Sequence, residues 1–171
     1  MTLTTRAESS FTPPVMATLK SPTHLLAAGL GSGLAPWAPG TFGSALAVLI
    51  YMASLAHLGP WLQLSVIFVS AVLGVYLCGR TASDWGVHDH KAIVWDEFVG
   101  QWIALFLLPW NSVFILLAFV YFRLFDIWKP WPIRWCDRHI HGGKGIMLDD
   151  LLAGVMALAA TQLTVYCAAL F

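Results

Sequence analysis

The sequence predicts an all-α integral membrane protein, a helical bundle with three or four spans. Of its 171 residues, 58% are hydrophobic and 11% are charged, whereas soluble domains carry about 25% charged residues. Mean hydropathy is +0.73. No Asp, Glu, Lys or Arg occurs in residues 21–79, 98–122 or 151–171. The net charge is zero, so no global field attracts nucleic acid.

Residues 1–20 are expected to form a flexible cytoplasmic tail, and residues 21–171 a single membrane-embedded domain. The tail is rich in Thr, Ser and Pro, and it lacks the apolar segment of a cleavable signal peptide. Apolar runs follow at 45–58 and 61–79, and Gly59-Pro60 between them marks a tight turn. These two runs are predicted to form a helical hairpin through the membrane, and residues 151–171 a further span.

The segment 98–122 allows two interpretations. Residues 109–111, Pro-Trp-Asn, divide it into halves that are each about 16–17 Å long as helices, too short to cross alone. It is therefore either one kinked span or a re-entrant hairpin with both ends on the same face. The hairpin brings the charged segments 80–97 and 123–150 together and places every Lys and Arg on the cytoplasmic side, which the positive-inside rule favours.

Two pairs of adjacent acids each precede an apolar run: Asp96-Glu97 in WDEFVGQW and Asp149-Asp150 in LDDLLAGV. Each pair is expected in or near the first turn of a helix, where the helix dipole stabilises an anion. Two such pairs need further neutralisation, and clustered carboxylate oxygens suit a hard cation such as Mg²⁺ or Mn²⁺. The alternative is that both pairs are solvated acids at the membrane interface.

Basic groups occur near these acids. In FRLFDIWKPWPIRW, Arg123, Asp126 and Lys129 are spaced to share one helical face, and Pro130 ends the helix. Arg and Lys suit phosphate oxygens, and Asp126 could bind metal or orient Lys129. The alternative is an interfacial ion-pair stripe flanked by tryptophans.

Two glycine-containing stretches provide further candidates. GSGLAPWAPGTFGS precedes a predicted span, and its Gly40, Thr41 and Ser44 could help to cradle an anion, although a plain turn is the alternative and no P-loop pattern is present. RHIHGGKG places Lys144 near Asp149 as a candidate phosphate partner. Acids combined with basic groups suit a metal–phosphate complex, and the surrounding tryptophans suggest a lipid phosphate as its substrate.

These motifs closely resemble the bacterial phosphatidylglycerophosphatase A family. The resemblance lies in LLAAGLGSGLAPWAPGTFGS, GVHDHKAIVWDEFVG, FRLFDIWKPWPIRWCDRHIHGGKGIMLDD and the LLAGV that follows. It implies a Mg²⁺-dependent phosphatase of the bacterial inner membrane that converts phosphatidylglycerophosphate to phosphatidylglycerol and phosphate, the last step of phosphatidylglycerol synthesis. It also assigns residues to three family motifs: Asp96, Glu97, Asp149 and Asp150 to the acidic one, Arg123, Asp126 and Lys129 to the central one, and Gly40, Thr41 and Ser44 to the N-terminal one.

The resulting hypothesis is a phosphatase domain over residues 21–171, with its active site facing the cytoplasm and a phospholipid as substrate. Metal binding is assigned to Asp96, Glu97, Asp149 and Asp150, and catalysis to these acids together with Asp126. Substrate binding is assigned to Arg123, Lys129, Lys144, Gly40, Thr41 and Ser44. The alternative is a membrane transporter or channel with an acidic cation or proton relay, which would place acids in the middle of spans rather than at their boundaries.

Overall fold

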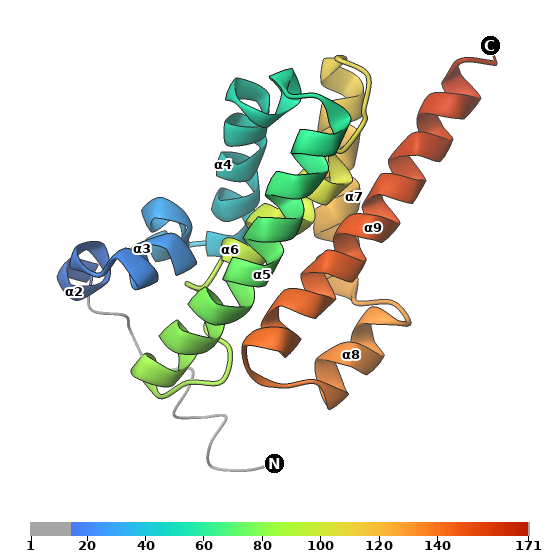
Figure 1. The fold of residues 1–171 in the computed structure, drawn as a ribbon. Coiled ribbons are helices and arrows are strands. Elements are labelled where there is room, and N and C mark those ends of the chain that lie inside the picture. The colour runs from blue at the N-terminus through green and yellow to red at the C-terminus, as the bar shows by residue number, and fades with distance from the viewer. Residues whose placement is uncertain (1–14, 171) are drawn as a thin grey trace.

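The computed structural model describes residues 15–170, and all regular structure in that range is helical (Figure 1). The predicted all-α class is therefore confirmed for this part of the chain. Residues 1–14 of the expected tail lie outside the described range, and residues 15–20 form a short helix. The elements in order are α2 (Val15–Lys20), α3 (Pro22–Ala27), the 3-10 helix η1 (Gly29–Leu34), α4 (Pro39–Ala53), the 3-10 helix η2 (Leu55–His57), α5 (Pro60–Trp85), α6 (Trp95–Ala104), α7 (Ser112–Trp128), α8 (Ile133–His139) and α9 (Gly142–Ala168).

Three helical segments are long and apolar enough to cross a membrane: Pro39–His57, Pro60–Trp85 and Gly142–Ala168. The predicted turn between the first two is present, because Gly59 is the N-cap of α5 and Pro60 begins the helix. Two of these helices exceed their predicted apolar runs. α5 continues past Gly79 to Trp85, and α9 begins at Gly142 rather than Leu151.

Helix α6 lies at the centre of the bundle, in contact with α4, α5, α7 and α9 (Figure 1). Its two tryptophans donate hydrogen bonds to two different neighbouring helices. Trp95 Nε1 donates to the Ser70 carbonyl of α5 at 3.1 Å, and Trp102 Nε1 donates to the Ala47 carbonyl of α4 at 3.0 Å. Both buried indole N–H groups are thereby satisfied, and α6 is fixed between two candidate spans.

Helices α6 and α9 cross at two glycines. A Cβ atom on Gly100 would lie 2.6 Å from the Asp150 carbonyl oxygen, and one on Gly154 would overlap the Gly100 carbonyl. Only residues without a side chain allow the two backbones to approach this closely. Asp96 lies one helical turn before Gly100, and Asp150 lies one turn before Gly154. The crossing therefore brings together acids that are distant in the sequence.

The segment 98–122 folds back on itself as a hairpin of α6 and α7. At its base, Arg123 Nη1 donates to Glu97 Oε1 at 3.2 Å. At its tip, the Trp110 ring packs against His57 with centroids 5.8 Å apart, so the tip lies beside the turn between α4 and α5. Asn111 caps α7 by accepting from the Val113 amide at 2.8 Å. The two ends of the segment lie together, as the hairpin interpretation predicts.

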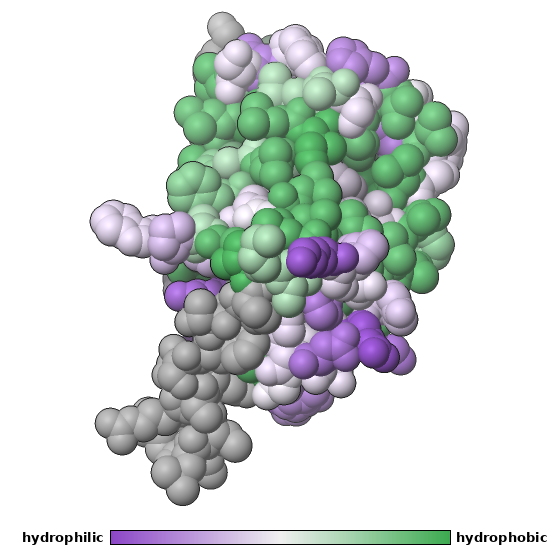
Figure 2. All heavy atoms as spheres, turned by 90° about the vertical axis from the view of Figure 1, so that its left-hand side faces the viewer, coloured by the Kyte–Doolittle hydropathy of each residue, from purple (hydrophilic) through white to green (hydrophobic). Residues whose placement is uncertain are grey.

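The two ends of the bundle differ in polarity. The connections at the hairpin tip, residues 54–59 and 105–111, contain no Asp, Glu, Lys or Arg. The connections at the opposite end, residues 86–94 and 129–141, are rich in charged residues. Figure 2 shows one face with a broad apolar area through its middle and upper part, a few hydrophilic residues at its top edge and more of them gathered below the apolar area.

Candidate functional site

A polar pocket of about 440 Å³ opens at the charged end of the bundle, where α4, α6, α7 and α9 meet. We call it the carboxylate pocket. It contains both predicted acidic pairs and the predicted Arg123, Asp126 and Lys129. Its lining residues are Ala38, Pro39, Gly40, Asp89, Lys91, Ile93, Asp96, Glu97, Arg123, Asp126, Lys129, Asp149 and Asp150.

The two acidic pairs enter the pocket from different positions along their helices. Asp96 and Glu97 lie in the first turn of α6, as predicted. Asp149 and Asp150 lie in the third turn of α9, so the prediction of a first-turn position for this pair is wrong. The glycine-rich stretch before them is helical because Gly143 packs directly on the Val75 carbonyl of α5. The helix dipole acts only within the first turn and therefore does not neutralise this second pair.

Lys129 supplies positive charge to the second pair. Its Nζ donates to Asp149 Oδ2 at 2.6 Å and to Asp137 Oδ1 at 2.6 Å. Burial lowers the pKa of Lys129, but the two carboxylates outweigh burial and raise it overall. Lys129 caps α7 in the left-handed conformation, with φ 46°. This conformation is uncommon for a residue with a side chain. The sequence suggested Asp126 as a partner of Lys129, whereas its observed ion pairs are with Asp137 and Asp149.

Arg123 joins α7 to α6 and α4 inside the pocket. Its Nη1 lies 2.7 Å from Asp126 Oδ2 and 3.2 Å from Glu97 Oε1. The same nitrogen is 3.4 Å from Ser44 Oγ, which itself donates to the Gly40 carbonyl at 2.9 Å. A Cβ atom on Gly40 would overlap Glu97 Oε1. Gly40 and Ser44 therefore act at this site by making room for the Arg123–Glu97 pair and by orienting it.

Three polar atoms of these side chains are buried without a hydrogen-bond partner: Asp96 Oδ1, Glu97 Oε2 and Arg123 Nε. Burial and the neighbouring Glu97 raise the pKa of Asp96 well above its usual value. Burial also raises the pKa of Glu97, to about 8, although Arg123 opposes this shift. Unpartnered buried polar atoms are costly. The pocket thus has acceptors suited to a cation and a donor suited to an anion. Within residues 15–170, no three Asp, Glu, His or Cys side chains are already grouped as a metal site.

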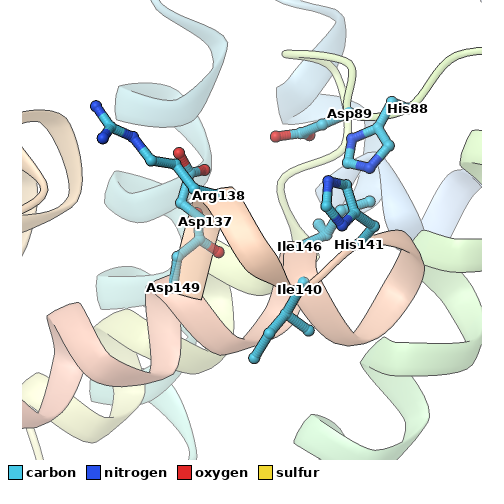
Figure 3. A pocket seen from close by; sticks show the side chains of 9 residues that line it. His88, Asp89, Asp137, Arg138, Ile140, His141, Ile146 and Asp149 are labelled. Atoms are coloured by element: carbon cyan, nitrogen blue, oxygen red, sulfur yellow. The ribbon is translucent and has the colours of Figure 1, made fainter. Parts of the chain in front are cut away.

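A second pocket of about 360 Å³ adjoins the first and shares Asp89 and Asp149 with it (Figure 3). The His88 and His141 rings pack edge to face there, with centroids 5.2 Å apart. Sequence reasoning did not assign Asp89, Lys91 or Asp137 to the site. Asp89 and Lys91 were visible only as polar residues near the first acidic pair, and Asp137 reaches the site through its ion pair with Lys129.

Three predicted substrate-binding residues do not line the carboxylate pocket. Ser44 is fully buried and reaches the site only through Arg123, and the other two are Thr41 and Lys144. Thr41 is exposed in the first turn of α4, and Lys144 is exposed in the first turn of α9. Neither lines the carboxylate pocket or the pocket beside it. The assignment of Thr41 rests on the glycine-containing stretch and on the family motif, and that of Lys144 rests on its nearness to Asp149 in the sequence.

The fold and the site together define a class: a helical protein with three candidate membrane spans and a pocket of acids and bases suited to a phosphate group. The phosphatidylglycerophosphatase A family matches residues 25–165. The chain belongs to this family, and it is a phosphatase.

Named relatives agree with this assignment. The chain is 53% identical to a phosphatidylglycerophosphatase A of Escherichia coli (strain K12), over 81% of each chain. It is 49% identical to the protein of that name from Haemophilus influenzae, over 82% of this chain and 86% of the relative. A putative phosphatidylinositol-3-phosphatase of Bacteroides thetaiotaomicron is 39% identical, over 77% of this chain and 86% of the relative. No solved structure matches the chain significantly.

Proposed function

We propose that this protein is a Mg²⁺-dependent phosphatidylglycerophosphatase of the bacterial inner membrane that completes phosphatidylglycerol synthesis. The names of two relatives support the substrate. The observation that carries the proposal is the carboxylate pocket itself. Buried carboxylate oxygens of Asp96 and Glu97 and the buried Nε of Arg123 have no hydrogen-bond partner there. The oxygens suit the positive metal ion of a metal–phosphate complex, and the Arg123 donor suits its negative phosphate.

The reaction is a hydrolysis. The oxygen of a water molecule forms a bond to phosphorus, and the bond from phosphorus to the glycerol oxygen breaks. The electron pair of that bond stays on the glycerol oxygen, which takes up a proton. The products are phosphatidylglycerol and inorganic phosphate, and no oxidant or second substrate is needed.

The acids that would hold Mg²⁺ are Asp96, Glu97, Asp149 and Asp150. Carboxylate oxygens are the ligands that this ion prefers, and the unpartnered oxygens of the first two fit that role. When bound, the ion would supply charge neutralisation at the phosphoryl oxygens and a lowered pKa for a coordinated water.

The basic residues would bind the phosphate. Arg123 is held by Asp126, Glu97 and Ser44, so its planar fork is fixed before the substrate arrives. Its free Nε can donate to a phosphoryl oxygen. Lys129 lies beside Asp149 and is the second basic group of the pocket. Asp126 acts in this proposal by holding Arg123 in place.

The orientation proposed for the bundle puts the carboxylate pocket on the cytoplasmic side. Among the described residues, every Lys and Arg lies at or beyond the charged ends of the helices, and the hairpin-tip connections contain none. Basic connections favour the cytoplasm. The transporter alternative disagrees with two observations: the chain belongs to a phosphatase family, and its acids gather in a pocket at one end of the bundle.

The test is phosphate release by the purified protein from phosphatidylglycerophosphate in detergent, with Mg²⁺ or with EDTA. Phosphatidylinositol 3-phosphate serves as a comparison substrate because of the name of one relative. We expect release from phosphatidylglycerophosphate with Mg²⁺ and none with EDTA. Absence of release under every condition would remove the enzyme proposal, and release that EDTA does not change would remove the metal.

A further inference from the structure

An apolar groove of about 390 Å³ lies between α4 and α7. We call it the α4–α7 groove. From α4 it is lined by Ala45, Val48, Leu49 and Met52. From α7 it is lined by Ser112, Ile115, Leu116 and Phe119. Leu49 is 63% exposed and Leu116 is 61% exposed, so the groove faces outward from the bundle.

The α4–α7 groove continues the wall of the carboxylate pocket. Along α7, Phe119 is followed by Arg123 at the i+4 position, which lies on the same helical face. Along α4, Ser44 is followed by Val48 at i+4. α4 starts at the pocket and α7 ends there, so the two helices are antiparallel. The row of side chains that each helix contributes to the groove therefore runs beside the row from the other helix. Each row is polar or small at the pocket and apolar beyond it.

The size and length of the groove fit one flexible chain. Ala45 and Ser112 are small residues, which leaves the space open at both ends of the lined region. The α4 side extends from residue 45 to residue 52, which corresponds to about 10 Å at 1.5 Å per residue. The groove leads toward the carboxylate pocket along α4 and α7, so a lipid whose headgroup lies in that pocket has an acyl chain within reach of the groove.

We propose that the α4–α7 groove binds one acyl chain of the phospholipid whose phosphorylated headgroup occupies the carboxylate pocket. This inference rests on the proposed function. Lipid tails in a bilayer are already in apolar surroundings, so the groove adds little hydrophobic driving force. Its contribution is to fix the depth and direction of the lipid, which orients the phosphate beside Arg123.

The direct test uses phosphatidylglycerophosphate with a photoreactive diazirine midway along one acyl chain. After irradiation of the wild-type protein, we expect the label mainly on peptides containing residues 45–52 and 112–119, with competition by unlabelled substrate. The exposed face of α5, which includes Phe68 and Val72, serves as the lipid-facing control. Equal labelling of α5, or labelling that unlabelled substrate does not reduce, would overturn the proposal. Protection of the groove by a second copy, seen as a crosslinked dimer, would also overturn it.

A matched pair of variants adds a kinetic readout. Ala45→Phe obstructs the groove, whereas Ala159→Phe makes the same change on the exposed face of α9. A phenyl ring in the groove would take space that the acyl chain needs. Overpacking of this kind costs enough free energy to lower kcat/KM for the dioleoyl substrate about tenfold. We expect that loss for Ala45→Phe and a change of less than about twofold for Ala159→Phe.

The outcomes separate the two proposals. No phosphate release by the wild type would remove the proposed function. An active wild type with equal kinetics for both variants would remove only the groove. If Ala45→Phe lowers the Tm in detergent, its kinetics no longer report on the groove, and the labelling pattern of the wild type decides whether the acyl chain binds there.

Discussion

Arg123 combines three contacts through one nitrogen, to Glu97, Asp126 and Ser44, and keeps a second buried donor free. A lysine would keep the charge but lose the fork that these contacts and a phosphate need. Hydrogen bonds to charged groups contribute about 1.5–3 kcal/mol. Arg123→Lys should therefore lower kcat/KM for phosphatidylglycerophosphate about tenfold to 100-fold. The control is Arg80→Lys, at an exposed ion pair on α5. Full activity of Arg123→Lys would contradict this role.

Asp150 is 3% exposed, and it has no ion pair among the described residues. Its charge is costly to the fold unless a cation is bound. Asp150→Asn should lower kcat at least about 100-fold, the loss typical of removing one electrostatic contact to a transition state. The Tm measured in EDTA should stay equal or rise. Asp84→Asn provides the control away from the pocket. Wild-type turnover by Asp150→Asn would argue against a ligand role.

At this scale the sequence identified most of the residues that line the carboxylate pocket, but it did not identify their ion-pair partners as well. The acidic pairs stand out because charge is scarce elsewhere in the chain. The bond from Lys129 to Asp137 depends on the placement of α8 and on a left-handed cap, and helical spacing reveals neither. Spacing did predict that Arg123 and Asp126 share one helical face, and they form an ion pair there because both lie within one regular helix.

Between elements, the crossing of α6 and α9 at Gly100 and Gly154 positions the acids of both helices. Gly154→Ala would press a methyl group against the Gly100 carbonyl. Overpacking of this kind costs about 1–3 kcal/mol, so both the Tm and kcat should fall. Gly59→Ala is the matched control, because nothing lies within 4 Å of a Cβ atom there. An unchanged Tm and kcat in Gly154→Ala would show that the close approach is not required.

Helix boundaries were predictable where local signals agree with packing. Residues 109–111 were expected to break the segment 98–122, and the Asn111 cap does begin α7 there. The start of α9 was missed because GGKG has low helix propensity. The contact of Gly143 with the Val75 carbonyl of α5 overrides that propensity, and it exists only once α5 and α9 are packed together.

For the whole molecule, the proposed orientation places the hairpin tip and the charged end on opposite sides of the membrane. In a background without Cys78, Cys136 and Cys167, Trp110→Cys should react with an impermeant maleimide from the periplasmic side. His139→Cys should react only in inverted vesicles. Trp110 contacts His57 in the turn between α4 and α5, so it lies at the end of the bundle away from the charged connections. Labelling of both positions from one side would contradict the proposed orientation.

Composition was sufficient to predict an all-helical fold with candidate membrane spans, because long segments without charge leave few other structures. It was not sufficient to predict the pocket. The sequence left the path of residues 98–122 open, and that path decides whether Glu97 can meet Arg123. The Gly100–Gly154 crossing then decides whether Asp96 and Asp150 line the same pocket, and neither feature is visible without the packed helices.

The central claim is that carboxylates of α6 and α9 share a divalent cation. Mn²⁺ prefers the same oxygen ligands as Mg²⁺, and its binding to the purified protein can be followed by electron paramagnetic resonance. We predict binding to the wild type that Mg²⁺ displaces, and affinity at least about tenfold weaker in both Asp96→Asn and Asp150→Asn. A wild type that binds no Mn²⁺, or variants that bind it as tightly as the wild type, would contradict the account.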